Sequence, residues 1–589
     1  MLGKYLKKIN PKVYRSILYI LVFFGTLLIC TLSLAGKYEM RSSKDDIGML
    51  ALPAKLAGLD WENVVSTTRY YGFVWYIVFT PLLKYCSSPT VIWNIIVYCN
   101  IGLISVSSCI ALYVAVKYLE FEENIATVIW CIFCITVTWY GSVSLSNESP
   151  LLLSIWLLVL AFCKFESAQT KKQKSIWLIV CILFCTYGFL IHTRAEILYA
   201  ALVITLVLHE IRNRDKKYLL YIVGCIIVAL VMFLIAKNVR NIIIGNIWKA
   251  ESAGDIQNVE VPFNISRIKS IFTKEGIHVF FDTLLCNMYT ATVRTSGVFG
   301  IAVIGTVIAV VNAFRAGKSE HSEVGTDVML LSMASTCAVL LGVVLTWGVG
   351  IIGTYSNPEE VNEYYKGMTY FRYYGTFLSP ALLVCVKNFG KDSKKQKIIS
   401  LITIVFVAFL YLYESLEIAP LRQFCDWSNS AQVIVIDKNG LIDYAGRKFA
   451  LIIAITNLLI LLNVRDKFNK LFLIFIMAVQ IMAVGNFKEV CFPYAKLPKW
   501  VEPAYNVLNE MDDEQKVYVP YNLMAYRLQF LAKNKSIIVG YPEEDDDGVI
   551  ITTTEYDENI PDTFYSVKIK DRQYLWLNKN ISYPVINIE

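Results

Sequence analysis

Charged residues are scarce in this sequence: they make up 17% of its 589 residues, against about 25% in typical soluble domains. Hydrophobic residues make up 56%, and the mean hydropathy is +0.51. A soluble fold needs polar cover and cannot hide this much apolar surface from water. The composition therefore excludes a soluble enzyme, a disordered chain, a coiled coil and a disulfide-stapled secreted domain. It predicts a polytopic, mainly α-helical membrane protein.

Several familiar motifs are also absent. The sequence has no phosphate-cradling glycine loop, no HExxH pattern and no zinc-spaced set of cysteines and histidines. Cys131 and Cys134 form a CxxC pair, but both fall in a predicted membrane helix, where a thiolate or metal centre would be costly. The net charge of +7 comes mainly from short basic clusters between apolar runs. This pattern indicates membrane topology and excludes a nucleic-acid partner.

About thirteen apolar runs approach the length of roughly 20 residues that a membrane-spanning helix needs. They cover residues 16–35, 90–116, 125–143, 150–163, 175–191, 195–211, 218–236, 290–314, 326–352, 373–386, 398–416, 448–464 and 471–487. The first run follows a basic N-terminus and lacks a small-residue cleavage site. We interpret it as a membrane anchor with a cytoplasmic N-terminus rather than a signal peptide.

A further run at 70–86 decides the predicted topology. If it lies in the outer interface without crossing, the basic clusters gather in inner loops, as the positive-inside rule expects. These clusters are Lys164–Lys174, Arg212–Lys217, Arg315–Lys318, Lys387–Lys397 and Arg465–Lys470. The segments that then face outward are 36–89, 237–289, 353–372, 417–447 and the C-terminal tail. We therefore expect a membrane domain over 1–488 and an extracytoplasmic domain over 489–589.

The tail carries more charge and shorter apolar runs than the rest of the chain. Its β-branched or aromatic runs cover 516–519, 536–540, 548–553 and 565–569, and a helix-like stretch covers 522–533. This alternation predicts a small α/β domain after the last span.

Two groups of acidic residues lie at the predicted outer ends of the spans. Asp45 and Asp46 are adjacent, so one carboxyl could have a raised pKa or the two could share a cation. Alternatively, either residue could cap the helical segment 47–59. Glu148 precedes Pro150, which suits the first turn of the next helix, so Glu148 could also be a capping acid.

Two groups containing arginine lie at the same predicted level. His192 and Arg194 fall in a short turn between two apolar spans, where such residues form a charged turn, pair with one another or line a cavity. Arg372 lies between Tyr370 and Tyr373. This stretch is either an aromatic interface belt with an arginine anchor, or a guanidinium that binds phosphate beside ring surfaces for a sugar or lipid.

All four groups lie on one predicted face of the membrane. Nucleotide sugars and ATP are cytoplasmic, so a group-transfer enzyme acting outside needs a donor already displayed there. A lipid-linked donor meets that condition. A transporter would more often place ionisable residues near the middle of the membrane, whereas the centres of these spans are largely apolar.

The motifs resemble the GT-C superfamily of integral-membrane glycosyltransferases, in particular the bacterial protein-mannosyltransferase and aminoarabinose-transferase group. In the first outer loop the resemblance rests on Asp45–Gly48, Leu56–Trp61, Tyr70–Gly72 and Pro81. Further along, Glu148 resembles the second acidic motif of the family, His192–Arg194 its His-x-Arg turn, and Tyr370–Tyr373 its Gly-Arg-Tyr motif, with Phe371 where Gly is common.

The resemblance implies an inverting transfer of a sugar from a polyprenyl-phosphate donor to an extracytoplasmic acceptor. Asp45 would be the general base, and Asp46 or Glu148 would orient the acceptor or hold a divalent cation. Arg372, together with Arg194, would neutralise the departing lipid phosphate. His192 would orient a neighbouring side chain.

The resemblance also implies a substrate groove formed by Tyr70, Tyr71, Tyr370 and Tyr373. The abundance of Ile, Lys, Asn and Tyr suggests an AT-rich bacterial genome, and hence a cell-wall or surface glycan as acceptor. Two other functions stay open. One is a transporter or flippase of a lipid-linked glycan, and the other is a polysaccharide polymerase or ligase, which would not need the pair of aspartates.

Overall fold

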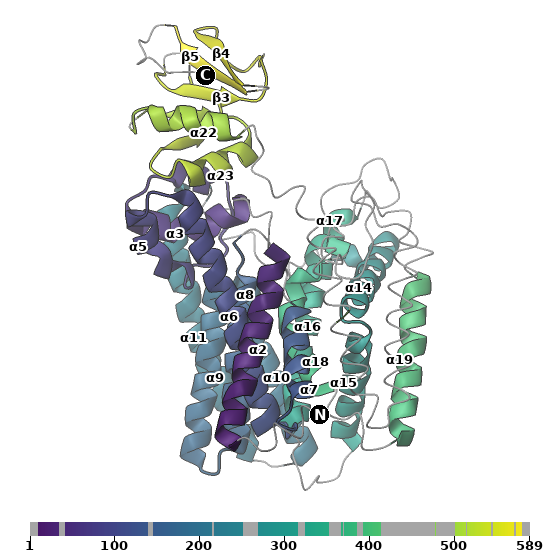
Figure 1. Cartoon of the computed structure of the whole chain (residues 1–589). Helices are drawn as coiled ribbons and strands as arrows, with labels where there is room; N and C mark the ends of the chain where they lie inside the picture. Colours follow the sequence, from purple (N-terminus) through teal and green to yellow (C-terminus); the bar gives the residue numbers. More distant parts are fainter. Residues whose placement is uncertain are drawn as a thin grey trace.

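The computed structural model shows a bundle of long helices with a small mixed domain at one end (Figure 1). The structure describes residues 10–34, 42–138, 145–214, 217–250, 252, 269–315, 324–352, 367–368, 370–385, 393–413, 478 and 501–579, except 514, 544–545, 556 and 571–572. The predicted spans at 448–464 and 471–487 fall outside these residues, apart from residue 478. So do the predicted outer segment 417–447 and most of 353–372.

The bundle is built from helices of very different burial. Its members are α2 (Pro11–Leu34), α6 (Pro89–Lys117), α7 (Ile125–Thr136), α8 (Glu148–Ser167), α9 (Lys171–Ile191), α10 (Ile197–Asn213), α11 (Lys217–Ile247), α14 (Lys274–Arg294), α15 (Val298–Arg315), α16 (Val324–Val343), α17 (Val349–Ile351), α18 (Arg372–Cys385) and α19 (Ser393–Tyr413). Helices α8 and α16 are mostly buried, whereas α2 and α11 carry rows of exposed Leu, Ile, Val and Phe. This arrangement matches a bundle whose outer helices face lipid.

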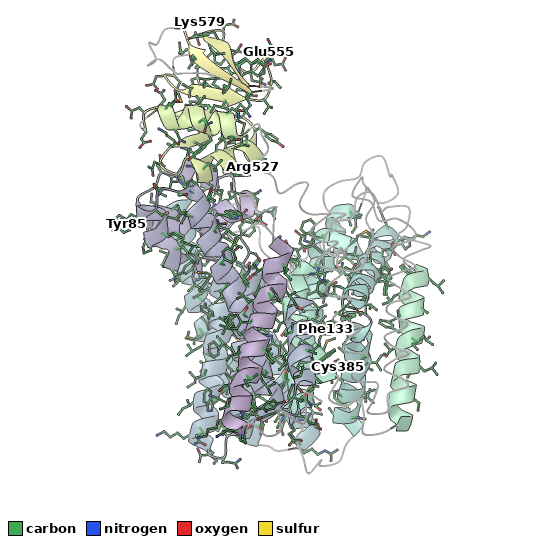
Figure 2. All side chains as sticks on the ribbon, viewed as in Figure 1. Tyr85, Phe133, Cys385, Arg527, Glu555 and Lys579 are labelled. Atoms are coloured by element: carbon green, nitrogen blue, oxygen red, sulfur yellow. The ribbon has the colours of Figure 1, made fainter. Side chains whose placement is uncertain are left out.

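Six helices among the described residues are long and apolar enough to cross a membrane. They cover Pro11–Leu32, Pro89–Lys117, Glu148–Ser167, Lys171–Ile191, Tyr218–Ile247 and Val324–Ile351. The chain is a multi-pass membrane protein. Side chains fill the interior between the helices, as Phe133 and Cys385 illustrate in Figure 2. The count of thirteen spans stays a prediction.

Some predicted spans have different bounds in the structure. The run at 218–236 belongs to α11, which continues to Ile247, into the predicted outer segment 237–289. The apolar run at 290–314 straddles the end of α14 and the whole of α15, because the chain turns at Ser296 and Gly297. Both residues have positive φ, 52° and 86°, which ends one helix and lets the next begin at Val298.

The segment after α2 lies across one end of the bundle. It forms α3 (Lys44–Ala57), α4 (Glu62–Val65), the 3₁₀ turn η1 (Tyr76–Phe79) and α5 (Thr80–Tyr85). The two helical pieces within the predicted 70–86 interface run total ten residues, too few to span a membrane. The loop between α4 and η1 packs tightly against α9, since the amide of Phe73 donates to the carbonyl of Leu190 at 3.1 Å.

Gly72 is required by this contact. Its φ is +95°, and a Cβ added there would lie 1.8 Å from the carbonyl oxygen of Ile191. We predict that Gly72→Ala destabilises the fold by more than the roughly 1–3 kcal/mol of a strained φ alone. Thermal unfolding of the purified protein measures this loss. Gly58→Ala is the matched control, because Gly58 has φ +83° and no atom within 4 Å of an added Cβ. Equal losses in the two variants would contradict the argument.

The C-terminal part forms a five-stranded sheet with strand order β2-β1-β3-β5-β4. Its strands are β1 (Val517–Val519), β2 (Ile537–Val539), β3 (Val549–Thr552), β4 (Phe564–Lys570) and β5 (Gln573–Asn578), and its helices are α22 (Val501–Glu510) and α23 (Asn522–Leu531). Strand β1 pairs in parallel with β2 and β3, whereas β5 pairs antiparallel with β3 and β4. The four expected strand regions and the helix are confirmed, and β5 is an addition.

This C-terminal part rests on the segment after α2 through side chain to main chain contacts. The Trp61 indole donates to the carbonyl of Lys533 at 2.8 Å, and the Ser42 hydroxyl donates to that of Tyr526 at 3.1 Å. Trp93 and Phe530 pack edge to face at 5.3 Å. The mixed domain therefore sits on the end of the bundle where α3 begins, which we call the site end (Figure 1).

Candidate active site

Four charged residues reach the site end from four helix termini. Asp45 lies in the first turn of α3, and Glu148 is the first residue of α8. Arg194 lies in the 3₁₀ turn η2 (Thr193–Glu196) between α9 and α10, and Arg372 opens α18. Helix ends place these side chains where charged groups can reach the membrane surface.

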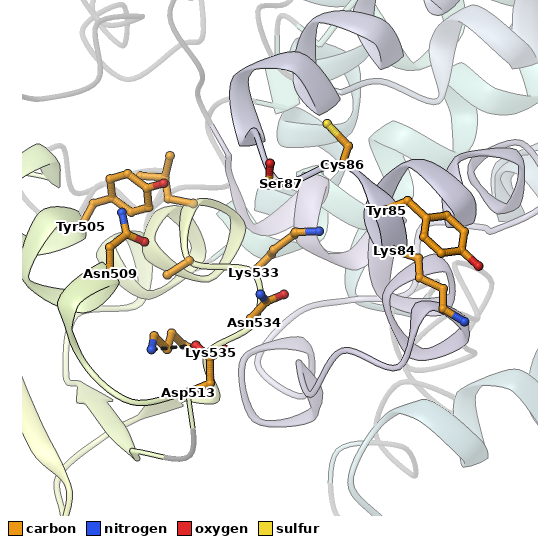
Figure 3. A pocket seen from close by; sticks show the side chains of 12 residues that line it. Lys84, Tyr85, Cys86, Ser87, Tyr505, Asn509, Asp513, Lys533, Asn534 and Lys535 are labelled. Atoms are coloured by element: carbon orange, nitrogen blue, oxygen red, sulfur yellow. Dashed lines mark ion pairs between the residues drawn. The ribbon is translucent and has the colours of Figure 1, made fainter.

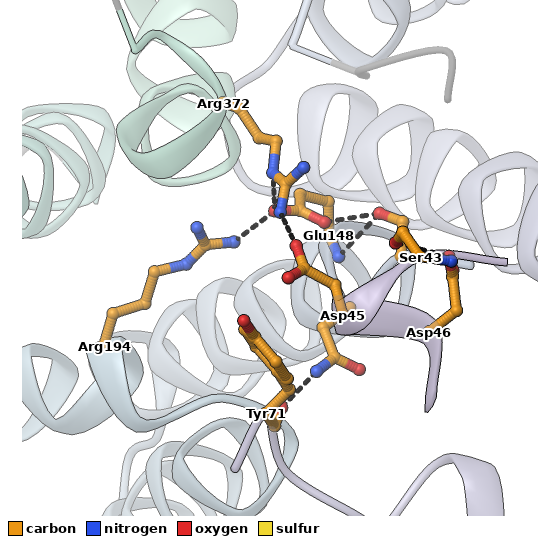
Figure 4. Close-up of polar contacts among 9 residues, drawn as sticks. Ser43, Asp45, Asp46, Tyr71, Glu148, Arg194 and Arg372 are labelled. Atoms are coloured by element: carbon orange, nitrogen blue, oxygen red, sulfur yellow. Dashed lines mark hydrogen bonds and ion pairs between the residues drawn. The ribbon is translucent and has the colours of Figure 1, made fainter. Parts of the chain in front are cut away.

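The four residues form one ion-pair network (Figure 4). Arg372 Nε lies 3.0 Å from Glu148 Oε1, and its Nη2 lies 3.2 Å from Asp45 Oδ2. Arg194 Nη2 lies 2.9 Å from the same Glu148 oxygen. Two carboxylates and two guanidiniums thus neutralise one another, and Arg372 bridges the two acids. The structure confirms none of their predicted roles, but it brings all four residues together.

The two carboxylates differ in exposure. The side chain of Glu148 is 4% exposed and that of Asp45 is 33% exposed. The Ser146 hydroxyl donates to Glu148 Oε2, so both oxygens of Glu148 are already hydrogen-bonded. Glu148 is therefore the fixed anchor of the two arginines, and Asp45 is the carboxylate that a substrate could reach.

Aromatic rings flank the two guanidiniums. Arg194 lies 5.1 Å from the Tyr373 ring and Arg372 lies 5.9 Å from the Tyr370 ring. Tyr370 and Tyr373 stack at 4.5 Å, and Trp347 stacks on Tyr370 at 5.3 Å. Sequence reasoning missed Trp347, although it lies in an apolar helix end where an indole is a common interface residue.

Tyr71 and Tyr70 point to different surroundings. The Asn147 amide donates to the backbone carbonyl of Tyr71, which holds that loop beside the network. Burial, reinforced by the neighbouring Asp45 carboxylate, raises the pKa of Tyr71 well above its usual range, so its hydroxyl stays protonated. Tyr70 instead packs on Trp248 at 6.0 Å and under Arg240 at 5.4 Å. Of the two tyrosines, only Tyr71 is brought to the network.

His192 caps the turn that carries Arg194. Its Nδ1 accepts the backbone N–H of Arg194 at 3.3 Å. Desolvation, followed by the Arg194 charge, lowers the pKa of His192 well below its usual range, so the ring stays neutral with its proton on Nε2. This placement agrees with an orienting role.

Asp46 faces away from the network and closes a capping box at the start of α3. Both the backbone N–H and the hydroxyl of Ser43 donate to Asp46 Oδ2 at 2.6 Å. Burial, with a smaller effect of Asp45, raises the pKa of Asp46 to about 8. A protonated cap and a Glu148 that already binds two guanidiniums do not fit a divalent cation.

Comparisons with known proteins bear on the fold. No family model matches the sequence, and no curated protein sequence matches it. The structure of ArnT from Cupriavidus metallidurans in the apo state covers 95% of this chain and 97% of its own, with a TM-score of 0.50 and 10% identity. The structure of that protein bound to undecaprenyl phosphate has the same coverage, a TM-score of 0.49 and 11% identity.

The chain shares its fold with ArnT. The resemblance inferred from the sequence motifs is thereby confirmed for the fold. At this identity the likeness shows the fold alone, so the roles of individual residues rest on the geometry of this chain.

The pKa of Asp46 predicts a pH dependence of stability. Because the pKa is raised on folding, Asp46 favours the folded state below about pH 4. That contribution is lost progressively as the pH rises through about 8. We predict that the Tm of the wild type falls between pH 7 and pH 9, and that Asp46→Asn, which keeps an oxygen for Ser43, flattens this fall. Parallel pH slopes for the two proteins would contradict the prediction.

A second polar cluster lies at the opposite end of the bundle, and sequence reasoning missed it. His209 Nδ1 lies 2.9 Å from Asp327 Oδ2 and 3.8 Å from Glu166 Oε1. Among the described residues, these three side chains are the one group of His, Cys, Asp and Glu close enough to hold a metal ion. Arg212 Nη2, however, lies 2.8 Å from Asp327 Oδ2 and 3.4 Å from His209 Nδ1. A guanidinium already supplies the positive charge, so we interpret the cluster as a structural clamp between α8, α10 and α16.

The clamp predicts a large stability effect. Asp327→Ala should cost about 3–5 kcal/mol, because it leaves the buried Arg212 charge without its carboxylate. Glu123→Ala breaks the exposed pair with Arg15, 2.6 Å apart, and should cost at most about 1 kcal/mol. Denaturation of both variants in detergent measures the difference. A comparable small loss in each would show that the cluster is not a clamp.

Proposed function

We propose that this protein is a membrane glycosyltransferase that moves a sugar from a polyprenyl-phosphate donor to an acceptor on the extracytoplasmic side, with inversion. The observation that carries the proposal is the network in which Arg372 bridges the buried Glu148 and the half-buried Asp45. A guanidinium is suited to a phosphate, and a reachable carboxylate beside it is suited to a base.

In the proposed mechanism, the donor phosphate replaces the Asp45 carboxylate as the hydrogen-bond acceptor of Arg372 Nη2. Glu148 keeps Arg372 and Arg194 in place while this happens, because both contact its Oε1. Once the phosphate has taken the arginine contact, the Asp45 carboxylate is available to accept a hydrogen bond from the acceptor hydroxyl. Binding of the donor thus makes Asp45 available as the general base.

In that step an acceptor hydroxyl oxygen attacks the anomeric carbon. The bond between this carbon and the phosphate oxygen breaks, the electron pair leaves with the phosphate, and the hydroxyl proton passes to Asp45. Negative charge grows on the phosphate in the transition state, where Arg372 and Arg194 stabilise it. Attack from the face opposite the phosphate inverts the anomeric centre.

The positions of the basic clusters support the proposed side of the membrane for the network. The connections at the end opposite the network carry the basic clusters, as between α8 and α9 and after α10. By the positive-inside rule, this distribution supports an extracytoplasmic position for the network. The proposal assigns catalysis to a membrane domain over 1–488 and acceptor contacts to an extracytoplasmic domain over 489–589, with a cell-wall or surface glycan as acceptor.

A donor panel tests the proposal. Purified protein in nanodiscs would receive polyprenyl-phosphate sugars with and without acceptor glycans, and the release of polyprenyl phosphate would be measured. Acceptor-dependent release, with the sugar label recovered on the glycan, is the expected result. Translocation of the labelled donor across liposomes without any release would overturn it in favour of a flippase.

A further inference from the structure

A cleft separates α5 from the C-terminal part at the site end (Figure 3). Its volume is about 380 Å³. Lys84, Tyr85, Cys86 and Ser87 line one wall. The other wall comes from α22 and from the turn after α23, with Tyr505, Asn509, Lys533 and Asn534 among its residues. The network described above shares none of these residues.

Lys533 gives the cleft its charge. The residue is only 8% exposed, and its ammonium donates to the backbone carbonyl of Leu83 across the cleft. An ammonium has three donors, so two further hydrogen bonds are open to a ligand. Lys535 and Asp513 also line the cleft and form an ion pair with one another at 2.7 Å. Among the described residues, no carboxylate forms an ion pair with Lys533 or with Lys84.

A buried lysine without an acid is costly, because burial disfavours the charged form. That desolvation lowers the pKa of Lys533. An anion bound in the cleft would offset this desolvation cost by placing a negative charge beside the Lys533 ammonium. Lys84, an exposed residue of the opposite wall, adds a second positive charge at the rim of the cleft, where its side chain points away from Lys533 (Figure 3).

The rest of the lining suits a sugar. The amides of Asn509 and Asn534 offer both donors and acceptors for hydroxyl groups. Tyr85 is 78% exposed at the rim, where the Lys84 ammonium lies 5.6 Å from its ring centroid, and this exposed ring can cover the apolar face of a sugar. A lipid headgroup would need the lysines alone, whereas this lining provides amides and a ring as well.

We propose that this cleft binds an anionic segment of a glycan, bearing phosphate or carboxylate groups, and that this glycan is the acceptor. The inference that the glycan is the acceptor rests on the proposed function. The site itself does not. The cleft then selects acidic surface polymers and holds them at the site end while one hydroxyl is glycosylated.

Binding to the full-length protein in phosphatidylcholine nanodiscs tests the site. The probes are labelled oligosaccharides of equal length that are neutral, carboxylate-bearing or phosphate-bearing. Wild type should bind an anionic probe, and Lys533→Met should weaken it about tenfold or more, as expected for a charged hydrogen bond. Lys84→Met, at an exposed position, should weaken it about threefold. Lys568→Met, on the exposed face of β4, should change nothing.

The outcomes separate the site from the reaction. Equal binding of neutral and anionic probes, or unchanged binding in Lys84→Met and Lys533→Met at normal Tm, would overturn the proposal. Displacement of the probe by phosphatidylglycerol in the nanodisc would also overturn it, in favour of a lipid headgroup. Lysine-dependent binding without any transfer by wild type would contradict the proposed function and still support the site. In active protein, Lys84→Met should raise the KM for acceptor and leave that for donor unchanged.

Discussion

Replacing Asp45 with Asn should reduce sugar transfer by about 10²–10⁴-fold, the usual contribution of a general base. Asn keeps the shape of the side chain and can still receive a hydrogen bond from Arg372, but it cannot take the acceptor proton. Donor binding should persist, because Glu148 holds both arginines without Asp45. Single-turnover transfer of labelled sugar, at donor concentrations that saturate the protein, isolates the chemical step.

Asp60→Asn is the matched control for this loss. Asp60 is an exposed acid of the same segment, just after α3, and lies outside the network. Its replacement should leave transfer unchanged. Because Asp45 lies in the first turn of α3, the Tm of Asp45→Asn must also stay near that of wild type. Full transfer by a stable Asp45→Asn protein would remove Asp45 as the base and leave it as a helix-terminal charge.

The sequence indicated which residues carry charge at the membrane surface, but not which of them meet. Asp45 and Arg372 are 327 positions apart and lie 3.2 Å from one another. Such a contact depends on how the helices pack, and the apolar pattern of each helix specifies its buried face without naming its neighbour. The family resemblance supplied the grouping that the pattern could not.

Adjacent residues show a finer limit. Asp45 and Asp46 looked alike in sequence, and both capping and chemistry were open to each. The structure separates them, because consecutive residues on a helix point about 100° apart. Asp46 turns back to Ser43, while Asp45 reaches Arg372. The Ser-x-x-Asp spacing from Ser43 to Asp46 was the available signal for this capping box.

Lys533 and the clamp residues were beyond reach for a related reason. None of these residues lies in a motif, and each acts through a partner that is far away in sequence. Lys533 contacts Leu83 across 450 positions, and Asp327 contacts Arg212 across 115. A single charge inside an apolar run, as at Asp327, was the one visible hint, since membrane helices rarely bury an acid without a partner.

Replacing Arg372 with Ala should lower turnover by about 10²–10³-fold, the range found when one donor to a developing negative charge is removed. Arg372→Lys should recover only part of the loss. Arginine contacts Glu148 through Nε and Asp45 through Nη2, two nitrogens held at a fixed spacing. A lysine has one nitrogen, so it can stay with Glu148 or follow the phosphate, but it cannot do both.

Three comparisons make this test specific to Arg372. Arg15→Ala removes an exposed arginine from its pair with Glu123 and should leave transfer unchanged. Transfer from a donor with a better leaving group, a polyprenyl diphosphate sugar, should be slowed less by Arg372→Ala, because less charge needs stabilising on the departing oxygen.

In the double variant with Arg194→Ala, the loss of transition-state stabilisation should be smaller than the sum of the two single losses, since both guanidiniums share one Glu148 oxygen. Additive losses would mean that the two arginines act on separate groups, and that the phosphate is bound by only one of them.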